Sequence, residues 1–149
     1  MVSSATARVS ASPADARRNK YRVVLATIMI GIGLLHFLRP GPFVTIVPSA
    51  LPAPYALVIV SGFFEVLGGV GLLVPRVRRA ASIGLVALYV AVFPANINMV
   101  VHPELGGGIA VWALWARLPL QIVFIAWALS VGRPVGRPVG TPERDIEGA

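Results

Sequence analysis

The sequence contains no cysteine among its 149 residues. Without thiols the chain forms no disulfides, carries out no thiol redox chemistry, and binds neither iron–sulfur clusters nor zinc through thiolates. Charged residues are also scarce, at 13% of the chain, whereas a soluble domain carries roughly a quarter. Hydrophobic residues make up 56% of the chain. Because a water-soluble core of this size could not bury so much apolar surface, we expect lipid to be the solvent.

Four long apolar runs account for most of the chain, at residues 21–38, 54–74, 80–101 and 108–131. About 20 helical residues cross a hydrocarbon core of ~30 Å. A segment in lipid must also satisfy its own backbone hydrogen bonds, which a helix does within itself. The sequence therefore predicts an all-α fold, a four-transmembrane-helix bundle that occupies residues 21–131.

The remaining segments are polar or too short to cross a bilayer. Residues 1–20 are rich in Ser, Ala and Arg, and residues 132–149 repeat Gly-Arg-Pro-Val, so we expect both ends to be disordered. The connection at 39–53 contains four prolines but also an apolar stretch at 43–47. Phe43, Ile46 and Val47 would share one face of a helix. A short interfacial helix or loop that covers the outer mouth of the bundle is the prediction here.

Basic residues lie almost entirely on one side of the predicted membrane. Eleven of the 13 Lys and Arg residues precede the first run or lie at its very start, separate the second from the third, or follow the fourth. Since cytoplasmic loops carry the excess of Lys and Arg, we expect a multi-pass protein of the cell membrane with both termini in the cytoplasm. The net charge of +7 is then a topology signal, and we expect no nucleic-acid partner.

Polar side chains interrupt all four runs, and they are His36, Glu65, Asn96, Arg117 and Gln121. A charged group near the middle of a bilayer costs at least ~2.5–3.5 kcal/mol on insertion scales, so such groups face inward and find partners. Pro94 and Pro119 each remove a backbone donor beside this set, which predicts kinks and free carbonyls. We therefore expect a polar ligand pocket in which Glu65 and Arg117 touch directly or through one polar neighbour.

Purely structural roles are the alternative for each of these residues. Glu65 and Arg117 can form an ion pair that only fixes helix packing. His36 can be an interfacial histidine that bonds a loop carbonyl, and Asn96 and Gln121 can be interhelical hydrogen-bond partners without a ligand. The convergence of four helices at one depth favours the pocket.

Four motifs, taken in order, resemble those of the DoxX-like membrane proteins. They are His36-Phe37 with Pro40, Phe43, Ile46 and Pro48; Ser61-Gly62 with Glu65 and Gly69; Pro94-Ala95-Asn96 with Met99; and Arg117-Leu118-Pro119-Leu120-Gln121. The resemblance covers Arg22 to Val131 and implies a small four-helix bundle with a polar pocket of the five residues named above. Some DoxX-like proteins are subunits of quinone-reducing sulfur oxidation systems, and others are partners of secreted oxidative-stress enzymes.

Three functions remain open on this basis. The first is an accessory subunit of a redox or stress-related membrane system, rather than an independent enzyme. Its pocket would bind a quinone-like or other small amphiphilic ligand, and its partner would be a membrane or secreted redox protein. The second is a small proton-coupled transporter, because a glutamate within a span is typical of small multidrug exporters. The third is a non-catalytic assembly or scaffold protein. The sequence indicates no catalytic residue and no metal site.

Overall fold

Helices form almost all of the chain that the computed structural model describes, which is residues 12–133. Four helices are long and apolar enough to cross a membrane. They are α1 (Pro13–Leu38), α3 (Pro54–Leu73), α4 (Arg78–Val101) and α5 (Val111–Gly132). Two short helices, α2 (Gly41–Val44) and η1 (Pro103–Gly106), lie between them, and residues 12–133 contain no strand. The predicted all-α, four-helix fold of a multi-pass membrane protein is confirmed.

Local capping explains why some helices begin where they do. α1 begins at Pro13, before the predicted start at Tyr21, because Ser12 Oγ accepts a hydrogen bond from the Asp15 amide and proline suits the first turn. Residues 13–20, predicted to be disordered, are therefore helical, while residues 1–11 and the predicted tail from residue 134 lie outside the described chain. α5 begins at Val111, after the expected position 108, because Gly107 and Gly108 have φ angles of 59° and 89°.

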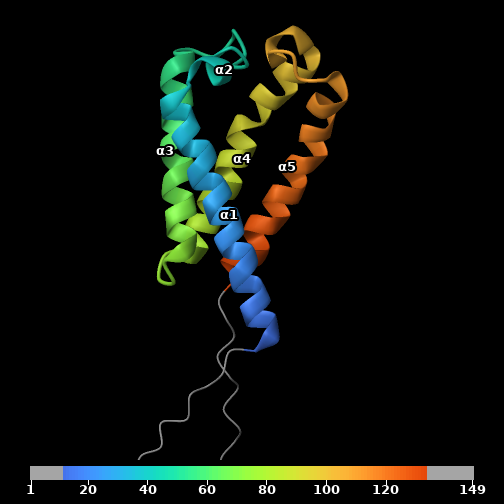
Figure 1. Ribbon diagram of the computed structural model, residues 1–149. Helices are drawn as coiled ribbons and strands as arrows, with labels where there is room; N and C mark the ends of the chain where they lie inside the picture. Colours follow the sequence, from blue (N-terminus) through green and yellow to red (C-terminus); the bar gives the residue numbers. More distant parts are fainter. Residues whose placement is uncertain (1–11, 134–149) are drawn as a thin grey trace, which may run out of the picture.

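Figure 1 shows that the described chain begins and ends at one end of the bundle, with α2 and η1 at the opposite end. We call the end with residues 12 and 133 the base, and the connection 39–53, which contains α2, the lid. The short α2 confirms the predicted helix or loop between the first two spans. It occupies the beginning of the predicted apolar stretch, and a turn follows it.

The helices pack as α1 on α3, α3 on α4 and α4 on α5, whereas α1 and α5 touch over a much smaller area. Glycines bring α1 and α3 together. A Cβ at Gly62 would lie 2.5 Å from the Cβ of His36, and one at Gly69 would lie 2.9 Å from the Ala26 carbonyl oxygen. Such approaches leave no room for larger side chains.

Two separate clusters of buried side chains hold the four helices together. The larger one lies toward the base and joins all four long helices through Leu25, Ala26, Met29, Leu72, Leu85, Tyr89, Ala128 and Val131. The smaller one lies at the lid end, where Ile46 of the lid packs with Met99, Val100 and Leu114. Between the clusters the α1–α3 pair and the α4–α5 pair diverge (Figure 1).

Candidate functional site

A cavity of about 780 Å³ lies between the diverging helices and beneath the lid. Its lining includes all five polar residues expected in a pocket, which are His36, Glu65, Asn96, Arg117 and Gln121. Each of the four long helices contributes at least one of them. Aliphatic and aromatic side chains make up most of the remaining wall.

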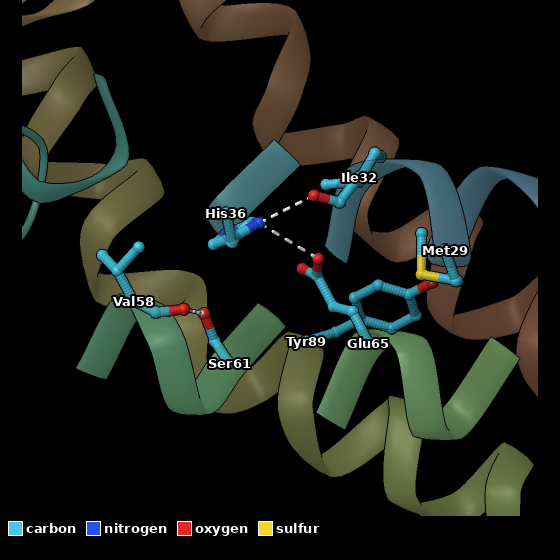
Figure 2. Close-up of polar contacts among 7 residues, drawn as sticks. All are labelled: Met29, Ile32, His36, Val58, Ser61, Glu65 and Tyr89. Atoms are coloured by element: carbon cyan, nitrogen blue, oxygen red, sulfur yellow. Dashed lines mark hydrogen bonds and ion pairs between the residues drawn. The ribbon is translucent and has the colours of Figure 1, made fainter. Parts of the chain in front are cut away.

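His36 and Glu65 face each other across the tightest part of the α1–α3 contact, and both are more than nine-tenths buried. Figure 2 shows the histidine ring nitrogen between two oxygens. His36 Nδ1 lies 2.9 Å from the Ile32 carbonyl oxygen and 3.3 Å from Glu65 Oε2. Because a carbonyl only accepts hydrogen bonds, Nδ1 must carry the proton.

One oxygen of Glu65 lacks a directed hydrogen bond. Oε2 is within ion-pair distance of His36 Nδ1, yet it is buried and has no hydrogen-bond partner within the described chain. These two observations agree if the Nδ1 hydrogen points at Ile32, since a single N–H cannot point well at two acceptors. The carboxylate oxygen therefore keeps acceptor capacity that a further donor could use.

The lid holds the His36 ring in place from the other side. Phe43 of α2 stacks on the imidazole with ring centroids 3.8 Å apart and an interplanar angle of 23°. Asn98 of α4 donates a hydrogen bond of 3.0 Å to the carbonyl of Ile46, which fastens the lid to a second helix. Sequence analysis did not identify this tether. His36 does not bond a loop carbonyl, the alternative considered from the sequence, because Ile32 of its own helix is nearer.

Asn96 and Gln121 connect α4 to α5 through a short chain of amide hydrogen bonds. Asn96 Nδ2 donates to Gln121 Oε1 at 2.6 Å, and Gln121 Nε2 donates to the Tyr89 carbonyl. That carbonyl is adjacent to the one that Pro94 leaves without an amide donor. These two side chains thus act as interhelical hydrogen-bond partners while they also line the cavity.

Arg117 lines the same cavity but does not pair with Glu65. Within residues 12–133 the ion pairs join His36 to Glu65 and His102 to Glu104. The direct Glu65–Arg117 contact expected from the sequence is therefore absent. The reason is the packing order of the helices: Glu65 lies on α3 against α1, and α3 does not pack closely on α5, which carries Arg117.

Several buried polar residues escaped the sequence analysis, among them Tyr89 and Arg22. Tyr89 lines the cavity and donates a hydrogen bond of 2.9 Å to Met29 Sδ, which links α4 to α1 (Figure 2). A phenol in the middle of an apolar span was the available signal. Arg22 was counted only as a topology charge, but it is 3% exposed. Its Nε donates to the Val131 carbonyl at 3.3 Å, at the carboxyl end of α5.

The donor set of the site is one acid, one imidazole, one guanidinium and two amides. Within the described chain, no group of three or more His, Cys, Asp or Glu side chains could hold a metal ion. What the cavity offers a ligand is therefore a hydrogen-bond acceptor at Glu65, donors at Arg117, and apolar surface around them.

A known protein family matches the part of the chain that contains this site. The sequence profile of a family described as Domain of unknown function (DUF8561) matches residues 25–132. The chain belongs to this family. The DUF8561 region begins within α1 and ends with α5, so it contains the lid and all five polar residues of the cavity. No curated protein and no solved structure matches the chain.

Proposed function

We propose that this DUF8561 protein is an accessory subunit of a redox or stress-related system of the cell membrane. Its cavity binds a quinone-like or other small amphiphilic ligand, and the base faces the cytoplasm. The orientation is supported by the basic residues. Within residues 12–133, all Lys and Arg residues except Arg39 and Arg117 belong to the first three turns of α1, to the α3–α4 junction or to the position after α5, as the positive-inside rule expects of the cytoplasmic side. The resemblance to DoxX-like proteins supports the same assignment and stays a prediction.

The observation that carries the proposal is Glu65, which lines the same cavity as Arg117 and whose buried Oε2 has no hydrogen-bond partner within residues 12–133. A buried polar atom without a partner costs about 1–3 kcal/mol. A ligand that donates to the Glu65 carboxylate and accepts from Arg117 would reduce this cost at Glu65 and give Arg117 a hydrogen-bond acceptor. A quinone-like ring fits because it carries oxygens at opposite ends. In the half-reduced form one oxygen is a hydroxyl and the other a carbonyl, and in the quinol each hydroxyl can both donate and accept.

The size and the chemistry of the wall agree with such a ligand. The volume of about 780 Å³ lies within the ~300–1,000 Å³ that small-molecule sites occupy, and those sites also combine apolar walls with few polar groups. Arg117 would hold the ligand carbonyl, while Glu65 and His36 would accept or return its proton. We place the source of electrons in a membrane or secreted redox partner, which is why the protein is an accessory subunit.

Binding of decylubiquinol, kept reduced under argon, to the protein in lipid nanodiscs tests the proposal, with empty nanodiscs as the reference for partitioning. Arg117→Met and Glu65→Gln should each weaken binding about tenfold, which corresponds to ~1.4 kcal/mol. Arg79→Met is the matched control, since Arg79 is exposed at the base and far from the cavity lining. If the wild-type protein retains no more quinol than empty nanodiscs, the ligand assignment fails. Equal binding by all four proteins would instead place the ligand outside this cavity.

A further inference from the structure

The contact between α3 and α4 changes along its length. Toward the base the two helices touch closely: a Cβ at Gly68 would lie 2.5 Å from Leu85 Cδ2, and one at Gly71 would lie 2.7 Å from the Ala81 Cβ. These residues define one contact stripe on each helix. At 3.6 residues per turn, the stripes continue toward the lid at intervals of three or four residues.

Nearer the lid the same two stripes line the cavity instead of each other. Val60 lies about three turns before Gly71 on the α3 stripe, and Val92 lies about three turns after Ala81 on the α4 stripe. Both side chains belong to the cavity wall. Figure 1 shows α4 leaning away from α3 toward the lid end. The cavity therefore extends into the space between α3 and α4.

This space opens toward the outside of the bundle. Leu57 and Val60 of α3 line the cavity, yet they are 41% and 51% exposed. Ala91 of α4 also lines the cavity and is exposed. A side chain that belongs both to a cavity wall and to the outer surface marks an opening. Because these helices are membrane spans, the surface around the opening faces acyl chains.

The lid, by contrast, covers the end of the cavity. Phe43 and Ile46 of the lid line the cavity at this end. Phe43 is held by stacking on His36, and Ile46 is held by the hydrogen bond from Asn98 to its carbonyl. Ile46 is buried in the cluster at the lid end. A ligand that arrives from water would have to displace these contacts, whereas one that arrives from the bilayer would not.

We propose that the ligand is an amphiphile with a single apolar tail, which enters sideways from the bilayer between α3 and α4. Its polar head lies at Glu65 and Arg117, and its tail leaves across Leu57, Val60 and Ala91 into the lipid. This inference rests on the proposed function for the polar head of the ligand. It adds the apolar tail of the ligand and the route by which the ligand enters. A tail suits this opening because its rim is apolar and because every methylene raises the concentration of the ligand in the bilayer.

The absence of cysteine from the sequence allows the route to be tested without any assumption about the natural ligand. Ser61→Cys places a single thiol in the cavity wall. In nanodiscs this thiol should react with N-hexadecylmaleimide, which dissolves in the bilayer, and should resist a charged, water-soluble methanethiosulfonate. Adding Val60→Trp should slow the maleimide reaction about tenfold, equivalent to ~1.4 kcal/mol of barrier. Val70→Trp is the control, because Val70 is exposed on α3 but does not line the cavity.

Two results would overturn the lateral route. One is faster labelling by the charged reagent, with no effect of Val60→Trp, because the route would then pass the lid. The other is that neither reagent labels the Ser61→Cys thiol, while Val70→Cys, which faces lipid, reacts readily with the maleimide. Both results can arise even if quinone binds in the cavity, so they are distinct from failure of the proposed function.

Protection experiments on the same Ser61→Cys protein test the tail. Decylubiquinol should protect the thiol at a total concentration at least about tenfold lower than its ring without the tail, 2,3-dimethoxy-5-methylhydroquinone. Both are used in the reduced form under argon, because the oxidised tail-less ring would itself react with a thiol. Equal protection by the two compounds would show that the tail contributes nothing and would overturn this part of the proposal. If neither compound protects, the quinone-like head of the proposed function is rejected, and the tailed quinone is rejected with it.

Discussion

His36 Nδ1 lies 3.3 Å from Glu65 Oε2, and the two side chains come from the helices that pack most closely in the bundle. The pair is buried, and Gly62 on α3 leaves just enough room for the histidine beside it. Each group is thus a polar partner of the other within a buried contact. Removing either one should expose the electrostatic cost of the other.

Single substitutions at this pair should be non-additive. His36→Ala and Glu65→Gln should each lower the free energy of unfolding by about 1–3 kcal/mol, because each removes the polar contact that the two buried side chains make at 3.3 Å. The double variant should lose less than the sum, with a coupling energy of ~0.5–3 kcal/mol. Thermal or denaturant unfolding in detergent measures these losses. The same cycle for Glu65 and Arg117 should give a smaller coupling, since the two side chains form no ion pair; a larger one would contradict the packing order of α3 and α5.

Gly62→Ala should destabilise the protein by about 1–3 kcal/mol, as overpacking does in a close contact. The added Cβ would lie 2.5 Å from the His36 Cβ, so α1 and α3 must move apart or the imidazole must leave its place. Gly84→Ala is the control, because a Cβ there meets nothing within 4 Å. That change should be neutral or stabilising, since alanine is favoured over glycine in a helix by ~1 kcal/mol. Equal effects of the two substitutions on the melting temperature would refute the close contact.

Asn98→Ala should loosen the lid while the rest of the bundle stays folded. The change removes the hydrogen bond to the Ile46 carbonyl, a loss of about 1 kcal/mol. Hydrogen exchange followed by mass spectrometry should be faster in the lid peptide that contains Phe43 and Ile46, with no change in α1 and α3 near the base. Unchanged exchange of the lid would mean that Phe43 stacking alone holds it closed.

Arg22→Met should affect the carboxyl end of α5 rather than the orientation of the protein. The Arg22 guanidinium donates to the Val131 carbonyl, and a cation at this end also suits the helix dipole. We expect a loss of ~1–3 kcal/mol and faster exchange of the last turn of α5. Arg79→Met removes the same charge from an exposed position at the base and should cost little. Similar losses from both would show that total charge, not the bond to Val131, matters.

Single cysteines report the orientation directly, since the native chain has none. Cysteines at Pro48 in the lid and at Gly107 after η1 should react in intact cells with a membrane-impermeant maleimide. A cysteine at Arg78, at the base, should react only after the cells are opened. Labelling of Arg78→Cys from outside would reverse the proposed topology.

The sequence alone predicted the helices well, because each apolar run must satisfy its backbone within lipid. It also selected the five polar residues that now line one cavity, because polar groups in a span must face inward. It could not predict which of them meet. Glu65 finds His36 rather than Arg117 because glycines set α1 against α3, and helix order is a property of the packed bundle. The start of α1 was missed although Ser12 and Pro13 are recognisable capping signals. The prediction included only the apolar span, which begins at Tyr21, whereas the helix continues through the polar residues before it.

The division of the buried side chains into two unequal clusters has a consequence for how the molecule opens. The cluster near the base includes residues from all four spans, whereas the one at the lid end joins only the lid, α4 and α5. Regions with few buried contacts open locally at lower free energy than the whole protein unfolds. The lid end is therefore the first cooperative unit to come apart, and the base can persist as a folded remainder. Exchange protection should rise along every span from the lid toward the base, as a gradient within single helices rather than a difference between them.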